Sequence, residues 1–279
     1  FANFSENFYF ESNIESEVSI NSVSKQALGV VGCISPWNLP LYLFTWKIAP
    51  ALIVGNTVLA KPSEITPLTA SKLAEICSDI GLPAGVLNIV NGSGQVAGDL
   101  LVKNKNIKAI SFTGGTDTGK KIYQNSFASL KKLSLEMGGK NPAIIFEDCN
   151  YESMLKTIVK SSFTNQGQIC LCSSRILVEE TIFEKFKTDF CNAISELNIG
   201  DPKNDKTQFG SITSDEQYKK IKHYINLAKN ENGNILLGGK AIQLQGRCKN
   251  GWFIEPTVIE GLDNRSRLNQ EEIFGPVVT

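Results

Sequence analysis

The stretch KAISFTGGTDTGKK, residues 108–121, indicates the fold class of the whole chain. A short apolar run with a strand-like pattern ends at Gly114 and Gly115, and a helical pattern begins near Asp117. Similar strands and amphipathic helices precede it in LGVVGCIS (28–35), NTVLAKPS (56–63), TASKLAEICSDIG (69–81) and VLNIV (86–90). Short apolar strands that alternate with such helices predict a doubly wound parallel α/β sheet of the Rossmann-like kind.

A second α/β unit begins near Lys140. The strand-like segment NPAIIFED (141–148) leads into a helix whose apolar side chains recur on one face, and RILVEE (175–180) is a further strand. Two more amphipathic helices follow before the chain ends. This region therefore predicts its own α/β domain rather than an appendage of the first sheet.

The chain divides into three parts on these patterns. Residues 1–27 are rich in Ser, Asn and Glu and predict a strand or hairpin that needs a partner surface, so we interpret them as an arm. The first domain covers 28–139 and the second covers 140–279. Because the sequence starts with Phe1 and stops at Thr279 inside the apolar run IFGPVVT, we expect a fragment truncated at both ends.

Composition excludes several classes of protein. Among 279 residues, 28 Lys and Arg balance 28 Asp and Glu, so no net positive field attracts nucleic acid or an anionic membrane surface. No apolar run approaches the roughly 18 residues that span a bilayer. The seven cysteines show no disulfide framework, which predicts reduced thiols and a cytoplasmic location. With His223 as the single histidine, we expect no metal site.

The glycine turn FTGGTDTGKK (112–121) can be interpreted in more than one way. It joins a strand to a helix, where backbone amides and the helix dipole can hold a phosphate group. It also partly fits the ATP-binding pattern GxxxxGK[ST], but Lys121 takes the place of the metal-binding hydroxyl and Asp117 puts a carboxylate in the anion cradle. An NTPase therefore stays a remote alternative, and a plain strand-to-helix turn is equally compatible with this motif alone.

The segment SSFTNQGQICLCSSR (161–175) contains two cysteines, Cys170 and Cys172, either of which is a candidate nucleophile. Thiol enzymes usually activate their cysteine with a histidine, but His223 falls away from the apolar stripe of its predicted helix. We therefore expect a carboxylate to serve as the base. Glu136 is a candidate because it ends the strand KKLSLE, which has a buried pattern, although an isolated Glu at a strand end is more often a surface residue.

Asn38 in SPWNLP (35–40) is a further candidate. It follows the strand GVVGCI, near the strand end at which open α/β sheets bind ligands, and an amide there can stabilise an oxyanion. A turn or a helix cap is the ordinary explanation for such an Asn.

Six motifs occur together in one order: PWNLP (36–40), KPSE (61–64), FTGGTDTG (112–119), LEMGGKNP (135–142), NQGQIC (165–170) and EEIFGP (271–276). This set resembles the NAD(P)-dependent aldehyde dehydrogenase superfamily over nearly the whole chain from Gly29 onward. Within the superfamily the chain is most similar to the branch that oxidises 2-aminomuconate semialdehyde, a branch also described as retinal-oxidising.

The resemblance implies a function and a set of site residues. It implies NAD-dependent oxidation of an aldehyde, such as 2-aminomuconate 6-semialdehyde, by a homo-oligomer whose arm lies at residues 1–27. Cys170 would be the nucleophile with Cys172 as a neighbour, Glu136 the base, and Asn38 the oxyanion donor together with the Cys170 amide. Residues 28–139 would bind NAD and 140–279 would be the catalytic domain. The implied cofactor contacts are Trp37, Lys61, Glu64, Gly114, Gly115, Thr116, Asp117, Thr118, Gly119, Met137, Glu272 and Phe274. A non-catalytic relative with the same fold is the alternative.

Overall fold

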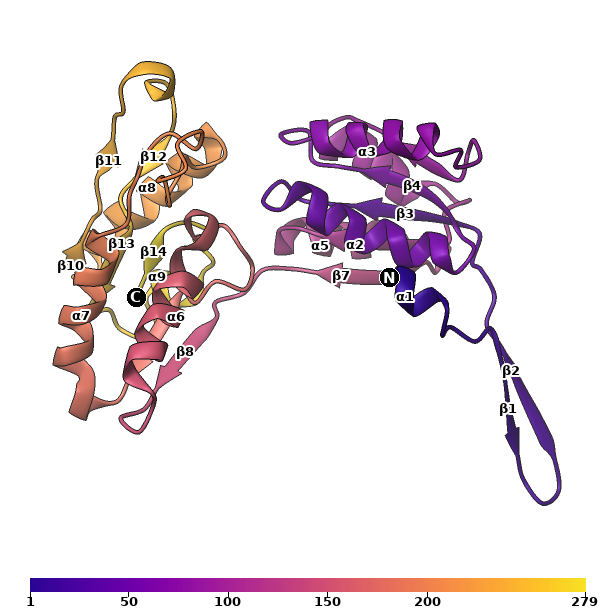
Figure 1. Ribbon diagram of the computed structural model, residues 1–279, viewed down its shortest axis with the longest axis horizontal. Coiled ribbons are helices and arrows are strands. Elements are labelled where there is room, and N and C mark those ends of the chain that lie inside the picture. Colours follow the sequence, from indigo (N-terminus) through magenta and orange to yellow (C-terminus); the bar gives the residue numbers. More distant parts are fainter. The chain divides into compact units, whose positions relative to one another are not determined.

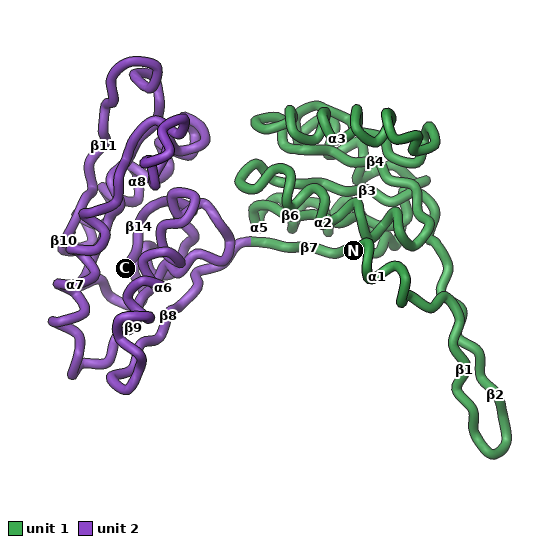
Figure 2. Tube along the Cα trace, in the orientation of Figure 1, with its two compact units in different colours: residues 1–137 green, residues 138–279 purple.

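The computed structural model describes residues 1–279 and separates into two compact units (Figure 2). Unit 1 comprises Phe1–Met137 and unit 2 comprises Gly138–Thr279. The division falls between Met137 and Gly138, whereas the sequence pattern put it between Gly139 and Lys140. The arm over residues 1–27 is part of unit 1.

Unit 1 is built on a five-stranded parallel sheet in the order β5-β4-β3-β6-β7 (Figure 1). The chain runs outward from the centre to β5 and then returns to place β6 against the other side of β3. This return makes a topological switch point between β3 and β6, where open α/β sheets bind ligands beyond the carboxyl ends of the strands. The strands are β3 (Val30–Ile34), β4 (Thr57–Lys61), β5 (Leu87–Ile89), β6 (Ala109–Thr113) and β7 (Lys132–Glu136).

Helices cover both faces of this sheet, so the predicted doubly wound α/β class is confirmed. Helices α2 and α3 contribute Phe44, Ile48 and Ala70 to one buried cluster, and α4 and α5 contribute Leu101 and Ile122 to another. The helices are α2 (Pro40–Ile53), α3 (Leu68–Asp79), α4 (Asp99–Lys103) and α5 (Thr116–Ser126), with short turns at Gly94–Gly98 and Phe127–Ser129.

The prediction of a buried strand over KKLSLE was wrong. The strand β7 forms the edge of the sheet, and its side chains at positions 132, 134 and 136 are exposed. An edge strand needs apolar side chains only on the face that meets a helix, so alternate positions stay accessible to water. Glu136 therefore has an exposed carboxylate in this structure.

The N-terminal arm forms a short helix, α1 (Ala2–Ser5), and an antiparallel hairpin of β1 (Glu11–Glu15) and β2 (Ile20–Ser24). Every residue of both strands is exposed. The hairpin extends away from the sheet of unit 1 (Figure 1). An isolated two-stranded hairpin is at best marginally stable in water and needs a surface to pack against. The exposed strands β1 and β2 lack such a surface here.

Unit 2 is a mixed α/β unit. Its parallel pair β8-β9 meets the sheet β10-β13-β14 through Thr279, whose amide donates to Ser174 O at 3.1 Å and whose carbonyl accepts from Ile176 N at 2.8 Å. The strands are β8 (Pro142–Ile145), β9 (Arg175–Val178), β10 (Asn234–Leu237), β11 (Ala241–Ile242), β12 (Phe253–Ile254), β13 (Thr257–Glu260) and β14 (Val277–Val278).

Two long helices of unit 2 start at polar caps that the sequence supplies. The Asn150 side chain accepts from Ser153 N before α6, and the Ser214 hydroxyl accepts from Gln217 N before α8. The exposed His223 lies on α8, as its position on the helical wheel predicted. The helices are α6 (Tyr151–Phe163), α7 (Phe183–Ser195), α8 (Asp215–Asn230) and α9 (Arg267–Gln270), with short turns at Thr164–Gly167, Glu180–Ile182 and Gly246–Cys248.

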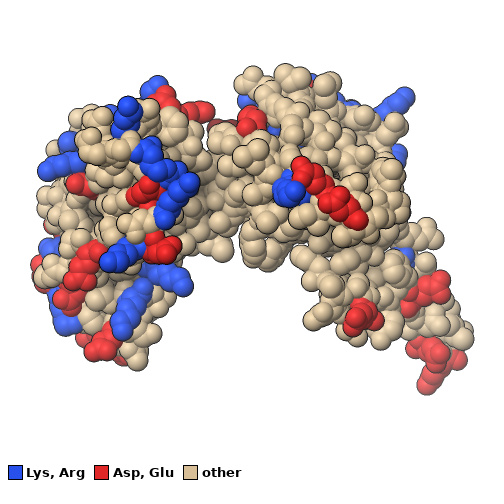
Figure 3. Space-filling model, turned by 45° about the horizontal axis from the view of Figure 1, so that its top comes forward, with Lys and Arg blue, Asp and Glu red and all other residues tan.

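The surface carries charges of both signs. On the face of unit 2 shown in Figure 3, basic and acidic side chains are interspersed, and the visible charges on the hairpin arm are mainly acidic. Each helix is too short or too polar to span a lipid bilayer.

Candidate active site

A cleft of about 420 Å³ lies at the carboxyl end of the unit 1 sheet. Ile34 and Lys61 line it from the ends of β3 and β4, and Thr118 lines it from the first turns of α5. The turn at Gly94–Gly98 closes another side. This is the place at which the strand order reverses, so the cleft has the position and the size of a ligand site in an open α/β sheet.

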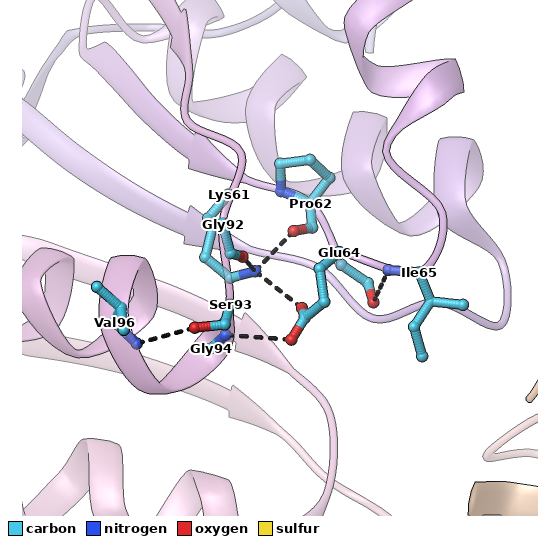
Figure 4. A network of polar contacts seen from close by, with 9 residues as sticks. Lys61, Pro62, Glu64, Ile65, Gly92, Ser93, Gly94 and Val96 are labelled. Carbon is cyan, nitrogen blue, oxygen red and sulfur yellow. Dashed lines mark hydrogen bonds and ion pairs between the residues drawn. The ribbon is translucent and has the colours of Figure 1, made fainter. Parts of the chain in front are cut away.

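Lys61 and Glu64 form a polar network in this cleft (Figure 4). The Lys61 side chain is 3 % exposed, and its ammonium donates to Pro62 O at 2.7 Å, Gly92 O at 3.0 Å and Glu64 Oε2 at 3.4 Å. The other oxygen of Glu64 accepts from Gly94 N at 3.2 Å. Lys61 thus holds Glu64 and the 92–94 segment together, and the long Glu64 contact is the one that a ligand hydroxyl can replace most easily.

Glu64 stays charged in this setting. Partial burial acts to raise its pKa, but hydrogen bonds from backbone amides and the nearby Lys61 charge outweigh it and hold the pKa below its ordinary value. The side chain remains 50 % exposed. A half-exposed carboxylate that already accepts from an amide still has lone pairs for the hydroxyl groups of a ligand.

The glycine turn before α5 brings backbone close to other groups. A Cβ atom on Gly114 would lie 2.5 Å from the Phe112 ring, and one on Gly119 would overlap the Met137 sulfur. Gly115 is the N-cap residue, and no side chain caps the helix. The first amides of α5 therefore have no side-chain acceptor, which leaves a helix N-terminus able to bind an anion.

Asn38 lies just beyond the carboxyl end of β3 and is 9 % exposed. The N-cap of α2 is Leu39, so Asn38 is not the residue that caps this helix. Pro36 and Pro40 restrict the backbone on both sides of it. Trp37, next to it, is half-buried.

The buried Lys47 on α2 is a feature that sequence reasoning missed. Burial lowers its pKa, while the charges of Cys33 and Glu136 act to raise it. Its ammonium lies 3.5 Å from Ser111 Oγ. Lys47 therefore couples electrostatically to Glu136, the predicted base. Its position in the apolar helix of residues 40–53 was the available signal, because a lysine is rarely buried without a partner.

In unit 2, a strained turn leads to the cysteine pair. After α6, Asn165, Gln166 and Gly167 have φ values of 51°, 57° and 68°. Consecutive left-handed residues are costly outside glycine. The buried Gln168 offsets this cost, since its Nε2 donates to Asn165 O at 3.1 Å and its Oε1 accepts from Thr213 N at 3.2 Å.

The two cysteines have different surroundings. Cys172 is 8 % exposed, its thiol lies 3.7 Å from Thr164 O, and burial raises its pKa to about 11. Cys170 is only half-buried and lines a small pocket that Glu272 and Phe274 also line. Both cysteines line this pocket, but Cys170 is the more exposed of the two, and burial keeps the Cys172 thiol protonated at neutral pH.

The loop EEIFGP forms the other wall of this pocket. The Glu272 carboxylate packs on Gly138, where a Cβ atom would overlap it, and burial raises its pKa against the lowering effects of the Lys220 and Lys140 charges and the Gly139 amide. Phe274 has a φ of 59°.

The Gln217 side chain fixes this loop from α8. It donates to Ile273 O at 3.0 Å and to Phe274 O at 2.7 Å. The two loops of the pocket also meet directly, because a Cβ atom on Gly167 would overlap the carbonyl oxygen of Gly275.

Comparisons with known proteins agree with this geometry. The family model "Aldehyde dehydrogenase family" matches residues 1–279. The chain belongs to the aldehyde dehydrogenase family. It is 48 % identical over 260 residues to a 2-aminomuconic semialdehyde dehydrogenase of Danio rerio, covering 92 % of this chain and 53 % of the relative. It is 44 % identical over 260 residues to a 2-aminomuconic 6-semialdehyde dehydrogenase of a Pseudomonas species, covering 93 % and 53 %.

Solved structures of this family superpose closely. Betaine aldehyde dehydrogenase from Staphylococcus aureus in complex with NAD⁺ has a TM-score of 0.94 and 38 % identity, covering 99 % of this chain and 55 % of that one. The chain therefore spans about half the length of the relatives that it matches. The predicted family resemblance is confirmed.

Within this aldehyde dehydrogenase chain, the predicted residues that line a cleft or pocket fall into two groups. Neither group includes Trp37, Gly114, Gly115, Gly119 or Met137. In unit 1, Lys61, Glu64 and Thr118 line one cleft, while Asn38 and Glu136 lie at the ends of β3 and β7. In unit 2, the pocket is lined by Cys170, Glu272 and Phe274. Thr116 and Asp117, in the first turn of α5, are exposed and lie outside the residues that line the cleft.

Proposed function

We propose that this chain carries the reaction centre of an NAD-dependent aldehyde dehydrogenase, which oxidises an aldehyde to a carboxylic acid. The observation that carries the proposal is the unit 2 pocket, in which the accessible Cys170 shares a lining with Glu272 and Phe274. A thiol beside a buried carboxylate and an aromatic ring suits a covalent step next to a bound cofactor.

The residues of unit 1 fit NAD. Glu64 offers a charged carboxylate to ribose hydroxyls beside Lys61, and the uncapped amides at the start of α5 suit a pyrophosphate. Glu272 and Phe274 in unit 2 suit the nicotinamide ribose and the nicotinamide. Trp37, Gly114–Gly119 and Met137 complete the proposed cofactor residues. When bound, NAD⁺ accepts the hydride that leaves the aldehyde carbon.

The chain's own residues perform the remaining chemistry. The Cys170 thiolate forms a C–S bond with the aldehyde carbon, and the oxyanion accepts hydrogen bonds from the Asn38 amide and the Cys170 backbone N–H. Loss of hydride turns this adduct into a thioester. Glu136 then takes a proton from a water molecule, whose oxygen attacks the thioester carbon and breaks the C–S bond. The exposed position of Glu136 is open to water.

The proposed substrate is a semialdehyde such as 2-aminomuconate 6-semialdehyde. Its support is the similarity to two proteins named for that substrate. Sequence identity of 40 % to a betaine aldehyde dehydrogenase of Bacillus subtilis makes a cationic aldehyde the natural competitor in an assay.

The test is NADH formation by the full-length protein with a muconic semialdehyde, betaine aldehyde, an uncharged aliphatic aldehyde and retinal. Cys170→Ala should abolish NADH formation and Cys172→Ala should largely retain it. A non-catalytic relative predicts no NADH with any of the four. If betaine aldehyde or an uncharged aldehyde has the highest kcat/KM by about tenfold, or about 1.4 kcal/mol, the substrate assignment fails and the reaction class stands.

A homo-oligomer and a cytoplasmic location complete the proposal. The exposed hairpin β1-β2 presents Ile14 and Ile20, which are 61 % and 69 % exposed, and a second copy would cover them. All seven cysteines are free thiols, which suits a reducing compartment. Deleting residues 1–27 should lower the oligomeric mass of the full-length protein in solution, and an unchanged mass would contradict the role of the arm.

A further inference from the structure

We propose that Asn141 is a positioning residue for the nucleophile, because it holds the backbone on the C-terminal side of Cys170 through its side-chain amide. Its Nδ2 donates to Cys170 O at 2.5 Å and to Cys172 O at 3.1 Å. The proposal rests on the proposed function, in which Cys170 attacks the substrate. Asn141 also lines the Cys170 pocket, and the role that we assign to it acts through the backbone of Cys170.

Asn141 is itself anchored on the sheet of unit 2. It immediately precedes β8, whose first residue, Pro142, pairs with Arg175 of β9. The Asn141 carbonyl accepts from Ser174 N and Arg175 N, both at 3.1 Å. One residue therefore contacts the loop at four backbone groups, two through its side chain and two through its carbonyl. The Cys170–Cys172 segment is held against a fixed strand rather than left as a free loop.

The side-chain amide of Asn141 supplies hydrogen-bond donors to the backbone carbonyls of Cys170 and Cys172. Residues 170–172 belong to no helix or strand, so their carbonyls lack the partners that regular structure provides. A primary amide has two N–H donors on one nitrogen, and here each can be assigned to one carbonyl. A carboxylate at the same place would set its oxygens against two carbonyl oxygens. A methyl group would leave both carbonyls without this donor.

The two hydrogen bonds from the Asn141 side chain to the Cys170 and Cys172 carbonyls form a clamp. This clamp bears on the chemistry because it orients Cys170. The carbonyl that Asn141 holds fixes the ψ angle of Cys170, and with it the direction of the backbone that carries the thiol and the N–H donor for the oxyanion. On the N-terminal side, Gln168 holds the left-handed turn. Cys170 is therefore restrained from both sides. A misplacement of about 1 Å at a reacting group can cost roughly 100-fold in rate.

The experiment uses the full-length enzyme with Asn141→Ala and Asn141→Asp, and with Asn192→Ala on the exposed face of α7 as a matched control. We expect Asn141→Ala to lower kcat at least about tenfold, with KM for NAD changed less than about threefold. Asn141→Asp should lower kcat further, because it adds repulsion to the loss of the clamp. Asn192→Ala should match wild type.

A purely structural role makes a different prediction. It would reduce the number of folded sites and leave the rate of each site unchanged. Each kcat is therefore divided by the number of Cys170 thiols that one-equivalent alkylation and mass analysis find reactive. If kcat per reactive Cys170 stays within about twofold of wild type in both Asn141 variants, the proposal is overturned. If Asn141→Ala does not fold, the Asn141→Asp variant, which preserves size, decides by the same criterion.

The failure of the proposed function would be visible separately. In that case wild type forms no NADH with any aldehyde. The rate of Cys170 alkylation by iodoacetamide at neutral pH then tests the clamp without turnover. Asn141→Asp should lower that rate at least about fivefold, since an added negative charge near the thiol opposes the thiolate, and Asn192→Ala should leave it unchanged. Equal rates in all three proteins would overturn the clamp itself.

Discussion

Replacing Gly167 by alanine should damage the nucleophile loop more than any other small substitution in it. Gly167 has a φ of 68°, and an added Cβ atom would overlap the carbonyl oxygen of Gly275 and lie 2.6 Å from its carbonyl carbon. Both contacts are with backbone, so no side chain can rotate away to make room. The loop that carries Cys170 and the loop that carries Glu272 must then move apart.

The size of the effect follows from two separate costs. An alanine in the left-handed region costs about 1–2 kcal/mol. Overpacking by one carbon in a filled site adds about 1–3 kcal/mol. Gly246→Ala is the matched control, because Gly246 has a similar φ of 65° with no atom within 4 Å of the added Cβ. It carries the first cost alone, so the difference between the two variants isolates the overlap.

The assay compares the thermal midpoint and the steady-state kinetics of the full-length enzyme in both variants. We expect Gly167→Ala to be the less stable by about 1–3 kcal/mol and to lose at least about tenfold in kcat. Gly246→Ala should keep wild-type kcat, because its loop lies outside both sites. Equal stability and equal kcat in the two variants would refute the argument that the two loops are packed in direct backbone contact.

Three further predictions concern single side chains. Glu64→Gln should reduce the preference for NAD over NADP by about fivefold, because the wild-type carboxylate repels a 2′-phosphate. This factor corresponds to about 1 kcal/mol for a half-exposed charge. An unchanged ratio of kcat/KM for NAD to kcat/KM for NADP would contradict the prediction. The Glu136→Gln enzyme should release one equivalent of NADH in a burst and then stop, since hydride transfer precedes the hydrolysis that needs the base. A kinetic trace with no burst would assign Glu136 to thiol activation instead. Cys172 should resist alkylation at neutral pH and should react faster as the pH rises toward its pKa of about 11. Equal labelling of Cys170 and Cys172 at neutral pH would contradict the argument that burial keeps the Cys172 thiol protonated.

The fold of unit 1 was predictable because its signals are local. The strand, glycine turn and helix over residues 108–121 follow from a short apolar run, two glycines and a helical pattern, all within one stretch of chain. The exposed edge position of β7 was not predictable in the same way. A strand at the edge and a strand in the middle of a sheet can carry similar apolar residues, and the choice depends on the order β5-β4-β3-β6-β7. That order is set by contacts between distant segments.

In the candidate site, too, local sequence patterns predict single residues but not the contacts between distant segments. Cys170, Glu64 and Glu272 sit in recognisable motifs, and the structure places each of them in a cleft or pocket. Asn141 also lies in a motif, LEMGGKNP, and Lys47 lies in an apolar helix, but neither pattern indicates which groups these side chains contact. Asn141 acts on a segment 29 residues away, and Lys47 lies 64 residues from Ser111 in the chain. Their partners are chosen by how the helices and strands pack, which a pattern of neighbouring residues does not encode.

The backbone strain of unit 2 is concentrated where the reactive groups are. Unit 2 has four non-glycine residues with positive φ. Asn165, Gln166 and Phe274 lie in the two loops that line the Cys170 pocket, and the fourth, Asn232, follows α8. Each of these left-handed residues destabilises the fold by about 1 kcal/mol or more, and one hydrogen bond stabilises it by a net amount of about 0.5–1.5 kcal/mol, which is similar. Gln168, in the first loop, makes one such bond to Asn165 within the loop and one to Thr213 outside it, and Gln217 supplies two to the other loop. The costs and the gains are of the same size, so each strained loop persists because one buried or half-buried glutamine side chain holds it. These glutamines therefore belong to the machinery of the site even though neither takes part in a chemical step.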